Sequence, residues 1–387
     1  MPMTDRKLRG AMVGGGPGSF IGPVHRMAAT MDGQAEYVSG VFSSSPEKSR
    51  DFGKELYLEA GRAHGTVEEL IEHETSLPEE RRVDFVTICT PNYAHYDAVC
   101  RFLEAGIHVI CDKPVTVSLE QAYDLKKRIE KSGLFFSLTH NYTGYPMVKQ
   151  ARHMVRQGEV GTIHKVVVEY PQGWLIGMLK NQQGAINPWR MDPAKAGKAS
   201  TMGDIGTHAE NLVRYVTGLT IESLCADIAA IVPTNPMEDD GNVLLHFKGG
   251  ARGVLIASQV STGEENGFNL RVYGDKAGMY WLQEDPNYLV IKDPSGFKKT
   301  YSKGNDILCE AARKAGRLPF GHPDGFIEAF ANIYLESFRG IRALLEGKPI
   351  PGDLDVPGIE DGIMGMQFIE TVVASAASDR KWCPWVS

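Results

Sequence analysis

Residues 8–22, LRGAMVGGGPGSFIG, decide the fold of this chain. The apolar run Leu8–Val13 predicts a strand, glycines follow at once, and a helical stretch containing His25 comes next. Glycines at such a turn let the backbone approach a pyrophosphate, whose charge a helix N-terminus favours. About three extra residues separate Gly16 from Gly22 relative to G-x-G-x-x-G. A glycine-rich turn without a ligand is the alternative, and the strand and helix around the turn make it the weaker one.

The same alternation continues as far as residue 142. Short apolar runs alternate with helix-period segments, a pattern that predicts a parallel sheet with helices on both faces. Right-handed crossovers then give a doubly wound Rossmann sheet, so residues 1–142 are expected to form a dinucleotide-binding α/β domain. The predicted strands are Leu8–Val13, Tyr37–Phe42, Val83–Cys89, His108–Cys111 and Phe135–Leu138, and Ser118–Ser132 is the clearest helix.

Residues 143–387 follow a different pattern, which predicts an α+β domain with a large, mainly antiparallel sheet. One helix, Tyr145–Gln157, leads into alternating strands, and Gly274–Gly278 has the composition of a hairpin turn. The predicted strands are Lys165–Tyr170, Asn242–Phe247, Gly253–Ser258 and Leu270–Tyr273, and the helices Gly325–Leu345 and Gly358–Ala377 close the chain.

Composition excludes several classes of partner. The 387 residues carry 41 Lys and Arg against 48 Asp and Glu, a net charge of −7, which offers no footprint for nucleic acid or anionic lipid. No apolar run is long enough to cross a membrane, and Met1–Gly10 lacks a signal-peptide core, so a cytoplasmic protein is expected. Its six cysteines contain no C-x-x-C pair and are expected to be reduced thiols.

Cofactor choice depends on the end of the second predicted strand. An NAD-binding sheet usually carries an acid there, whereas this chain has Ser43, Ser44 and Ser45, followed by Lys48 and Arg50. The absence of a carboxylate removes the repulsion against a 2′-phosphate, and the nearby cations could bind one. The sequence therefore permits NADP as well as NAD.

Two kinds of motif carry candidate chemistry. Thr90–His95 (TPNYAH) and Cys111–Pro114 (CDKP) follow parallel strands, at the edge where open α/β sheets bind ligands. Gly203–His208 (GDIGTH) opens a helix on which Asp204 and His208 are four residues apart, and a carboxylate beside an imidazole suits proton transfer near neutral pH. A solvated Lys113, a helix-capping Asp204 and a core His208 are the alternatives.

Together these motifs resemble the Gfo/Idh/MocA family of oxidoreductases over nearly the whole chain, with D-K-P in place of the family's E-K-P. The resemblance implies that Lys113, Asp204 and His208 are catalytic. The longer glycine loop and Asp112 depart from the family pattern and affect the expected cofactor geometry. Cofactor contacts are predicted at Gly14, Gly16, Ser19, Phe20, Ile21, Gly22, Ser43, Lys48, Thr90, Pro91, Asn92, His95, Asp112, Lys113, Asn141, Trp189 and Arg190.

Residues 140–142, 189–193 and 321–323 look like the corresponding segments of longer members of the family that act on glycosides, anhydrosugars or cyclitols. Substrate contacts are predicted at Lys113, Tyr142, Arg190, Asp204, His208 and His322. Each added residue has a plainer interpretation: Trp189 in the core, Arg190 paired with Asp192, and His322 as a cap at Asp324. No metal site is predicted, because His208 and Glu210 point to different helix faces and the remaining histidines show no ligand spacing.

The predicted reaction is reversible oxidation of a secondary ring hydroxyl of a sugar, glycoside or cyclitol, with hydride transfer to NAD(P). His208 is the expected base, Lys113 stabilises the developing alkoxide, and Asp204 orients the substrate or the imidazole. One alternative is a glycoside-cleaving enzyme with tightly bound NAD that oxidises its sugar transiently. A second is a non-catalytic nucleotide- or sugar-sensing regulator. The family resemblance also implies a homodimer or homotetramer.

Overall fold

The computed structural model describes residues 6–177 and 188–386, which form two compact units. Unit 1 comprises Met1–Thr116, Glu120–Asn141 and Phe330–Ile363, and unit 2 comprises Val117–Leu119, Tyr142–Ala329 and Met364–Ser387. The chain leaves unit 1 briefly at Val117–Leu119 and then at Tyr142. The later return of the chain differs from the contiguous division into 1–142 and 143–387, because Phe330–Ile363 packs with the N-terminal unit.

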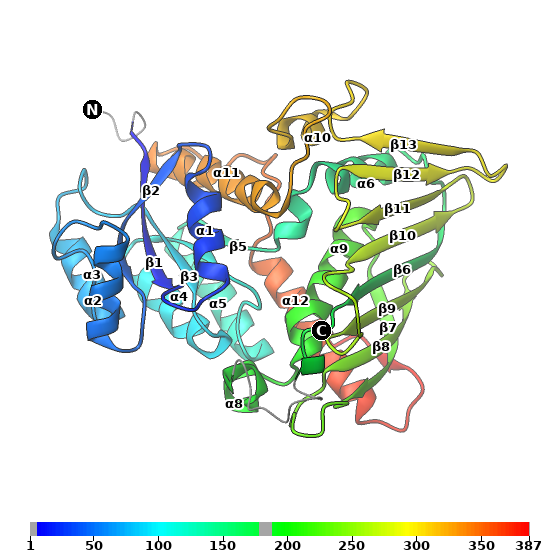
Figure 1. Cartoon of the computed structure of the whole chain (residues 1–387), viewed down its shortest axis with the longest axis horizontal. Coiled ribbons are helices and arrows are strands. Elements are labelled where there is room, and N and C mark those ends of the chain that lie inside the picture. The colour runs from blue at the N-terminus through cyan, green and yellow to red at the C-terminus, as the bar shows by residue number, and fades with distance from the viewer. Residues whose placement is uncertain (1–5, 178–187, 387) are drawn as a thin grey trace. The chain divides into compact units, whose positions relative to one another are not determined.

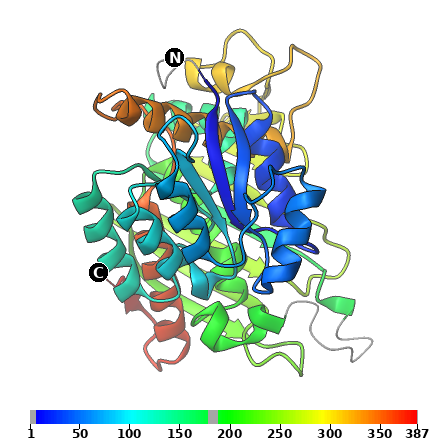
Figure 2. The ribbon, with the colours of Figure 1, turned by 90° about the vertical axis from the view of Figure 1, so that its left-hand side faces the viewer.

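Unit 1 is built on a five-stranded parallel sheet with helices on both faces (Figures 1 and 2). The strand order, β2-β1-β3-β4-β5, confirms the predicted doubly wound Rossmann topology. The central strands β3 and β4 are buried at every position, as expected for parallel strands covered on both faces. The strands are β1 (Leu8–Gly14), β2 (Ala35–Val41), β3 (Phe85–Cys89), β4 (His108–Cys111) and β5 (Phe136–Leu138).

Local capping fixes where the helices at the β2 edge begin. Ser45 caps α2, with Pro46 in the first turn, and the Thr66 hydroxyl accepts from the Glu69 N–H at the start of α3. The helical elements between β1 and β5 are α1 (Ile21–Thr30), α2 (Pro46–Glu55), α3 (Val67–Ser76), the 3₁₀ turn η2 (Asn92–Ala94), α4 (His95–Glu104) and α5 (Leu119–Ser132).

The late segment belongs to unit 1 because helix α11 (Phe326–Leu345) completes its core. The buried Tyr334 hydroxyl lies 2.8 Å from His25 Nδ1 on α1 and 3.0 Å from the Thr87 hydroxyl on β3. Gly340 packs so closely on the Phe135 ring that a Cβ would lie 2.2 Å from it. Periodicity predicted this helix but gave no sign of which unit it joins.

Unit 2 contains a nine-stranded sheet of order β13-β12-β11-β10-β6-β9-β8-β7-β14. Neighbouring strands are antiparallel except β6 and β9, so the predicted mainly antiparallel α+β unit is confirmed (Figure 1). The strands are β6 (Ile163–Pro171), β7 (Ile221–Ala229), β8 (Asp240–Phe247), β9 (Arg252–Ser258), β10 (Asn269–Gly274), β11 (Gly278–Leu282), β12 (Tyr288–Lys292), β13 (Lys298–Ser302) and β14 (Cys383–Pro384).

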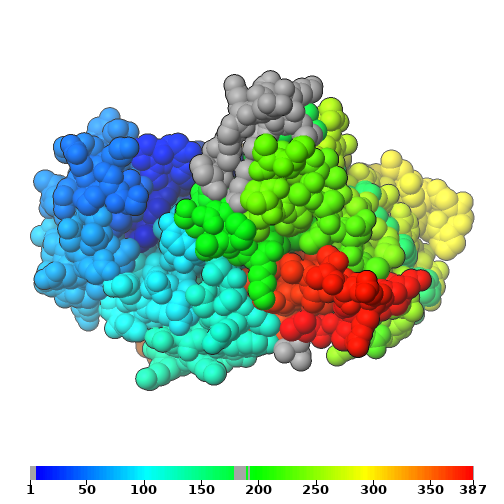
Figure 3. Space-filling view, turned by 90° about the horizontal axis from the view of Figure 1, so that it is seen from below, coloured from blue at the N-terminus to red at the C-terminus, as the bar shows by residue number. Residues whose placement is uncertain are grey.

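The predicted hairpin at Gly274–Gly278 joins β10 to β11, with Tyr273 opposite Gly278. The C-terminal part of the chain, in red, is exposed on the face seen in Figure 3. Strand β14 pairs with β7 in the sheet of unit 2. The remaining elements are η3 (Asn141–Gly144), α6 (Pro146–Arg156), η4 (Pro188–Met191), α8 (Pro193–Ala196), the π-helical η5 (Met202–Gly206), α9 (Thr207–Thr217), α10 (Glu310–Ala315) and α12 (Ile359–Ala376). Among the described residues, no helix combines the length and apolarity required to span a membrane.

One buried histidine makes the stability of unit 1 depend on pH. His108 Nδ1 accepts the Phe135 N–H at 3.0 Å, so the ring is neutral in the fold, and burial lowers its pKa to about 4. The unfolded chain, with a pKa near ~6.5, binds this proton first as the pH falls. We expect His108 to lower the free energy of unfolding by up to about 3 kcal/mol as the pH falls from 6.5 to 4. Urea unfolding across that range measures the loss.

The matched control is His108→Asn, whose side-chain oxygen can accept the same N–H but does not titrate. Its unfolding free energy should fall less steeply than that of the wild type over the same range. Equal slopes for the two proteins would show that His108 does not carry the effect.

Candidate active site

The glycine turn after β1 leaves no room for side chains on its inner face. A Cβ on Gly16 would lie 2.0 Å from the Phe42 carbonyl oxygen, and one on Gly22 would lie 2.3 Å from the Gly15 oxygen. Gly14 has φ +89°, a region that L side chains rarely adopt. The turn therefore packs its backbone directly on the carboxyl ends of β2 and β3 and on the start of α1.

The residues between these glycines begin helix α1. The Ser19 hydroxyl accepts the Gly22 N–H at 3.1 Å, whereas Phe20 is 77% exposed, and Ile21 is the first residue of the helix. The N-cap residue of α1, Phe20, makes no side-chain capping bond, and the first turn carries no acidic residue. A helix start without a carboxylate suits an anionic ligand.

The serine cluster predicted to lie near the ribose follows the end of β2. Ser43 is half-buried, and its hydroxyl accepts the Ser45 N–H at 3.1 Å. Lys48 lies in the first turn of α2 and is exposed. The side chains that follow β2 are thus neutral or basic at the predicted positions, apart from the exposed Glu47 within α2.

The buried ring of His95 holds the loop after β3 in place, and His95 is not exposed on that loop. The ring is buried, with Nε2 2.9 Å from the Thr90 carbonyl oxygen and Nδ1 2.8 Å from that of Pro114. Burial lowers the pKa of His95 because it disfavours the charged ring. Asp112 and the two carbonyls favour the protonated ring and partly oppose this shift. His95 therefore positions the loops after β3 and β4, while Pro91 and Asn92 form the solvent side of the first.

The acid before Lys113 is fixed from several sides. Asp112 Oδ1 accepts the Lys113 N–H at 2.9 Å and the Thr139 hydroxyl at 2.7 Å, and Oδ2 lies 3.8 Å from His25 Nε2. Burial alone would raise the pKa of Asp112, but His25, Lys113 and Thr139 together lower it. A carboxylate therefore holds the backbone from which the half-buried Lys113 extends. Sequence reasoning did not identify His25 or Thr139 as its partners.

Two buried polar atoms at the same edge of the sheet indicate that a ligand fits there. Thr90 Oγ1, after β3, and Asn141 Nδ2, after β5, have no hydrogen-bond partner among the described residues. Leaving such atoms unpaired costs about 1–3 kcal/mol each, so they are normally satisfied by a ligand or water. Together with the open glycine turn, they fit the polar ribose and amide groups of a dinucleotide.

In unit 2, Asp204 and His208 lie on one continuous helix that contains a π-helical turn. The Glu238 carboxylate accepts the N–H groups of Ser200 and Met202, so Glu238, and not Asp204, caps this helix. Burial raises the pKa of Glu238. Asp204, in the π-helical turn, is left to face other side chains, and such turns are frequent at functional sites.

Asp204 is oriented by a glutamine that the sequence analysis missed. Gln259 Nε2 donates to Asp204 Oδ2 at 3.0 Å, and the Thr201 hydroxyl donates to Gln259 Oε1 at 2.9 Å, which fixes the amide. Arg190 Nε lies 3.9 Å from the same carboxylate oxygen. Gln259 directly follows strand β9, so its place after a strand was a possible signal, although no motif marked it.

His208 packs against a pair of tyrosines. Its ring meets Tyr142 edge-on, with centroids 4.8 Å apart, and lies 6.4 Å from Tyr170. The two tyrosine hydroxyls hydrogen-bond to each other, and Tyr170 also donates to Asn266. Desolvation raises the pKa of both tyrosines, and the nearby charge of Asp204 adds to it. Tyr142 is 5% exposed, so it presents a neutral aromatic wall to the imidazole.

The remaining predicted residues take different environments. The Arg190 guanidinium lies 4.7 Å from the centre of the Trp189 ring, while Asp192 caps α8 and pairs with Lys195. The plainer pairing of Arg190 with Asp192 is therefore replaced by the contact with Asp204. His322 is exposed, with Nδ1 3.2 Å from the Phe320 oxygen. Asp324 instead accepts the Arg317 N–H and pairs with Lys303.

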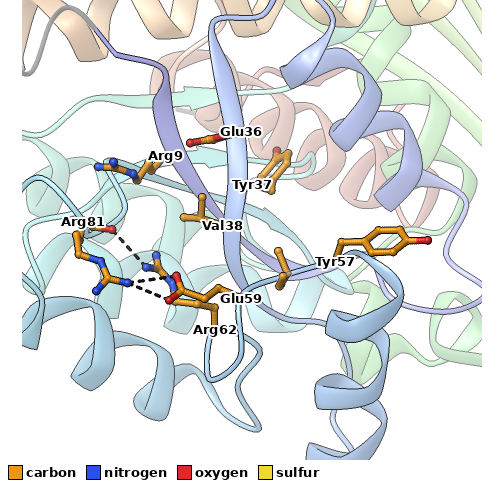
Figure 4. Close-up of a pocket in the computed structure, with 9 residues that line it drawn as sticks. Arg9, Glu36, Tyr37, Val38, Tyr57, Glu59, Arg62 and Arg81 are labelled. Atoms are coloured by element: carbon orange, nitrogen blue, oxygen red, sulfur yellow. Dashed lines mark hydrogen bonds and ion pairs between the residues drawn. The ribbon is translucent and has the colours of Figure 1, made fainter.

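A cavity of about 370 Å³ lies elsewhere in unit 1, over β1, β2 and the segment after α2 (Figure 4). Its lining residues are Arg9, Glu36, Tyr37, Val38, Tyr57, Leu58, Glu59, Arg62 and Arg81. None of them is a predicted site residue. Ligands of open α/β sheets bind at the carboxyl ends of the strands, so this cavity is not the cofactor site.

Comparison with known proteins gives matches over both units. Residues 8–140 match the oxidoreductase family with an NAD-binding Rossmann fold, and residues 148–280 match the GFO/IDH/MocA C-terminal domain. An uncharacterised oxidoreductase of Bacillus subtilis, YfiI, is 33% identical over 98% of this chain and 97% of its own. Levoglucosan dehydrogenase of Pseudarthrobacter phenanthrenivorans is 24% identical over 84% of this chain and 86% of its own.

Among solved structures, an inositol dehydrogenase homologue of Azotobacter vinelandii is similar in two complexes. With NAD⁺ it has a TM-score of 0.94 and 31% identity over 98% of both chains. With NADH and myo-inositol it has a TM-score of 0.90 and 30% identity, again over 98% of both chains.

The glycine turn gives a test that needs no substrate. Gly16→Ala would place a methyl group against the Phe42 carbonyl and push the turn away from β2. We expect dinucleotide affinity to fall at least ~10-fold, about 1.4 kcal/mol, as measured by calorimetric titration of the purified protein. Gly352→Ala is the control, because a Cβ there meets nothing within 4 Å. Unchanged affinity in a folded Gly16→Ala protein would contradict the assignment of the turn.

Proposed function

Because the chain belongs to the Gfo/Idh/MocA family of NAD-binding oxidoreductases, we propose that it reversibly oxidises a secondary ring hydroxyl of a sugar, glycoside or cyclitol to the ketone. The observation that carries the proposal is the hydrogen bond that Gln259 donates to Asp204. Asp204 lies on the same continuous helix as His208. An anchored carboxylate near an imidazole is suited to move the hydroxyl proton that must leave with hydride.

His208, Asp204 and Lys113 are the three residues proposed to act on the substrate. His208, walled by Tyr142, accepts the hydroxyl proton, and Asp204 orients the substrate or the imidazole. Lys113 donates a hydrogen bond to the same oxygen and stabilises the alkoxide charge as it develops. The bound dinucleotide supplies the hydride acceptor at its nicotinamide ring.

The residues proposed to hold the dinucleotide come from four strand ends of unit 1. The turn containing Gly14 and Gly16 receives the pyrophosphate, and Thr90 and Asn141 offer buried polar atoms to the nicotinamide half. Ser43 meets the adenosine ribose, where an acid would exclude a 2′-phosphate. NAD is proposed because the Azotobacter vinelandii homologue is complexed with NAD⁺, and NADP, which Lys48 could pair with, is tested beside it.

The substrate class follows from the polar groups near Asp204. Arg190 offers donors beside the Asp204 carboxylate, and Trp189 offers a flat ring, a combination that suits a polyhydroxylated ring. The names of relatives agree: the Azotobacter vinelandii homologue is complexed with myo-inositol, and another relative is a levoglucosan dehydrogenase. Inositols and anhydrosugars are therefore the first compounds to test.

The direct experiment follows absorbance of reduced nicotinamide with NAD or NADP and a panel of inositols, glucosides and anhydrosugars. Reduction that requires one ring compound and one nucleotide is the expected result. A protein that releases nucleotide on denaturation, yet reduces none with any ring compound, would contradict an exchanging dehydrogenase.

Removing the lysine should separate chemistry from binding. We expect Lys113→Ala to lower kcat by about 10²–10⁴-fold, the range for a lost proton-transfer or charge-stabilising group. Dinucleotide affinity should stay within about threefold by calorimetry, because the turn and strand ends are untouched. Lys127→Ala, an exposed lysine on α5, is the control with normal kcat. Loss of dinucleotide binding together with kcat would refute the catalytic assignment.

Gln259 is expected to act through Asp204. Gln259→Leu removes the amide that holds the carboxylate, and we expect kcat to fall about 10-fold with a shifted pH profile. Gln259→Glu should be worse, because it places a second negative charge near Asp204. A Gln259→Leu enzyme with wild-type kcat and pH profile would show that this hydrogen bond does not serve the reaction.

We also propose that the protein is a homo-oligomer. One face of the unit 2 sheet exposes Leu244, Tyr273, Tyr280 and Tyr288, which the strand register places on the same side. These side chains are 36–45% exposed although they are large and apolar or aromatic. Light scattering should give a dimeric or tetrameric mass, and a monomeric mass would refute the proposal.

A further inference from the structure

Three side chains in unit 1 bring unsatisfied ligand atoms together beside helix α3. They are His64, which precedes α3, and His73 and Glu74, near the end of that helix. His64 Nε2, His73 Nδ1 and Glu74 Oε1 lie within 4.8 Å of one another. Each of these three atoms is buried and has no hydrogen-bond partner among the described residues.

The rest of each residue is firmly placed. Glu74 is fully buried, and its other oxygen, Oε2, accepts from Arg62 at 3.0 Å and from the Val83 N–H at 3.1 Å. His64 is 6% exposed, and its backbone N–H donates to the Gly40 carbonyl at 2.8 Å. The Glu74 carboxylate is therefore held through Oε2 while Oε1 keeps its lone pairs, and the backbone that carries the His64 ring is fixed.

His73 differs from the other two because it reaches solvent. Its side chain is 36% exposed, and Nδ1 lies 3.7 Å from Glu74 Oε1. The two imidazole rings are 5.1 Å apart. Ligand atoms around a tetrahedral Zn²⁺ are about 3.3 Å apart, given bonds of about 2.0–2.2 Å. The three atoms must therefore move closer to bind Zn²⁺, and His73, whose side chain is partly exposed, is the one we expect to rotate.

Three unpaired buried polar atoms are costly, at about 1–3 kcal/mol each, and folded proteins rarely keep them without a partner. Two imidazole nitrogens and a carboxylate oxygen form a ligand set that Zn²⁺ commonly takes, with water in the fourth position. A buried water is the rival occupant, because it could also bridge these atoms.

We propose that His64, His73 and Glu74 form a Zn²⁺ site in unit 1, with a water molecule as the fourth ligand. The site is separate from the dehydrogenase chemistry, because none of its residues lies at the carboxyl ends of the strands. The proposal departs from the expectation that no metal site is present, because the nine-residue separation of His64 and His73 matches no ligand motif and the fold brings their ligand atoms together.

The site is tied to the end of β2 by hydrogen bonds. The Ser49 hydroxyl donates to the His64 carbonyl at 2.6 Å and accepts the Phe42 N–H at 2.9 Å. Phe42 is the residue on which Gly16 packs, and Ser43 follows it. A bound metal would therefore brace the segment that carries the ribose side of the dinucleotide.

Arg62 lines the cavity over β1 and β2 and also hydrogen-bonds to the proposed ligand Glu74. One terminal nitrogen donates to Glu74, and the other lies 3.4 Å from the Arg81 carbonyl oxygen, inside the cavity wall (Figure 4). Its positive charge balances Glu74 in the metal-free protein. Because Arg62 binds Oε2 while the metal takes Oε1, the carboxylate can serve both at once.

The test uses the full-length protein, stripped with chelator and then dialysed against Zn²⁺. Elemental analysis should give one Zn²⁺ per chain, and a hundredfold excess over Kd should raise the melting temperature by at least about 4 °C. Co²⁺ should give the intense visible absorbance of a tetrahedral site. None of these measurements depends on activity or on the proposed reaction.

His73→Gln is the decisive variant, because His73 is partly exposed and its replacement spares the buried Arg62–Glu74 pair. We expect it to weaken Zn²⁺ binding at least about 100-fold, and His64→Gln to do the same. His164→Gln, at an exposed histidine on β6, should bind like the wild type. Metal-free His73→Gln should melt within about 2 °C of the metal-free wild type, which shows that it folds.

Two results would overturn the proposal. Less than a tenth of an equivalent of Zn²⁺ after dialysis would mean that water fills the space between the three ligands. Undiminished binding in the folded His73→Gln protein would place the metal elsewhere in the chain.

Discussion

The close backbone contact between the glycine turn and the ends of β2 and β3 is the constraint on which the rest of the structure depends. Where a Cβ on Gly16 would lie 2.0 Å from a carbonyl oxygen, no other residue fits without moving a strand. The turn therefore brings a helix start, two strand ends and the Ser43 segment within reach of one another. The arrangement of this edge of unit 1 depends on that contact, because Gly14 packs on the end of β3 and Gly16 on Phe42, next to Ser43.

Much of the fold could be predicted from local signals. Continuous apolar runs such as β3 and β4 indicate buried parallel strands, and the Gly274–Gly278 hairpin was marked by its composition. Local signals could not predict where Phe330–Ile363 packs. That choice depends on tertiary contacts, such as the Tyr334 hydroxyl against His25 and Thr87, which leave no periodic trace in the sequence.

The residues of the candidate site also divide into those that local sequence patterns predicted and those that they did not. Lys113, Asp204 and His208 were found because short motifs carry them. Gln259, Tyr170 and Asn266 were not, since their role is to hold other side chains, and a hydrogen bond across 55 residues has no local pattern. His95 was identified as a cofactor contact from its motif, yet both of its ring nitrogens face backbone oxygens. A motif can thus mark an important residue without revealing whether it binds the ligand or supports those that do.

Helix α11 also bears on how the protein is made. The first 142 residues contain every strand of the parallel sheet, but Tyr37, Thr87 and His25 find their common partner only at Tyr334. On the ribosome, the N-terminal sheet must wait with this polar cluster uncovered while most of the antiparallel unit is synthesised. The unit that contains the first strands is therefore completed only after Phe330–Ile363 has been synthesised, and its maturation depends on translation of that segment.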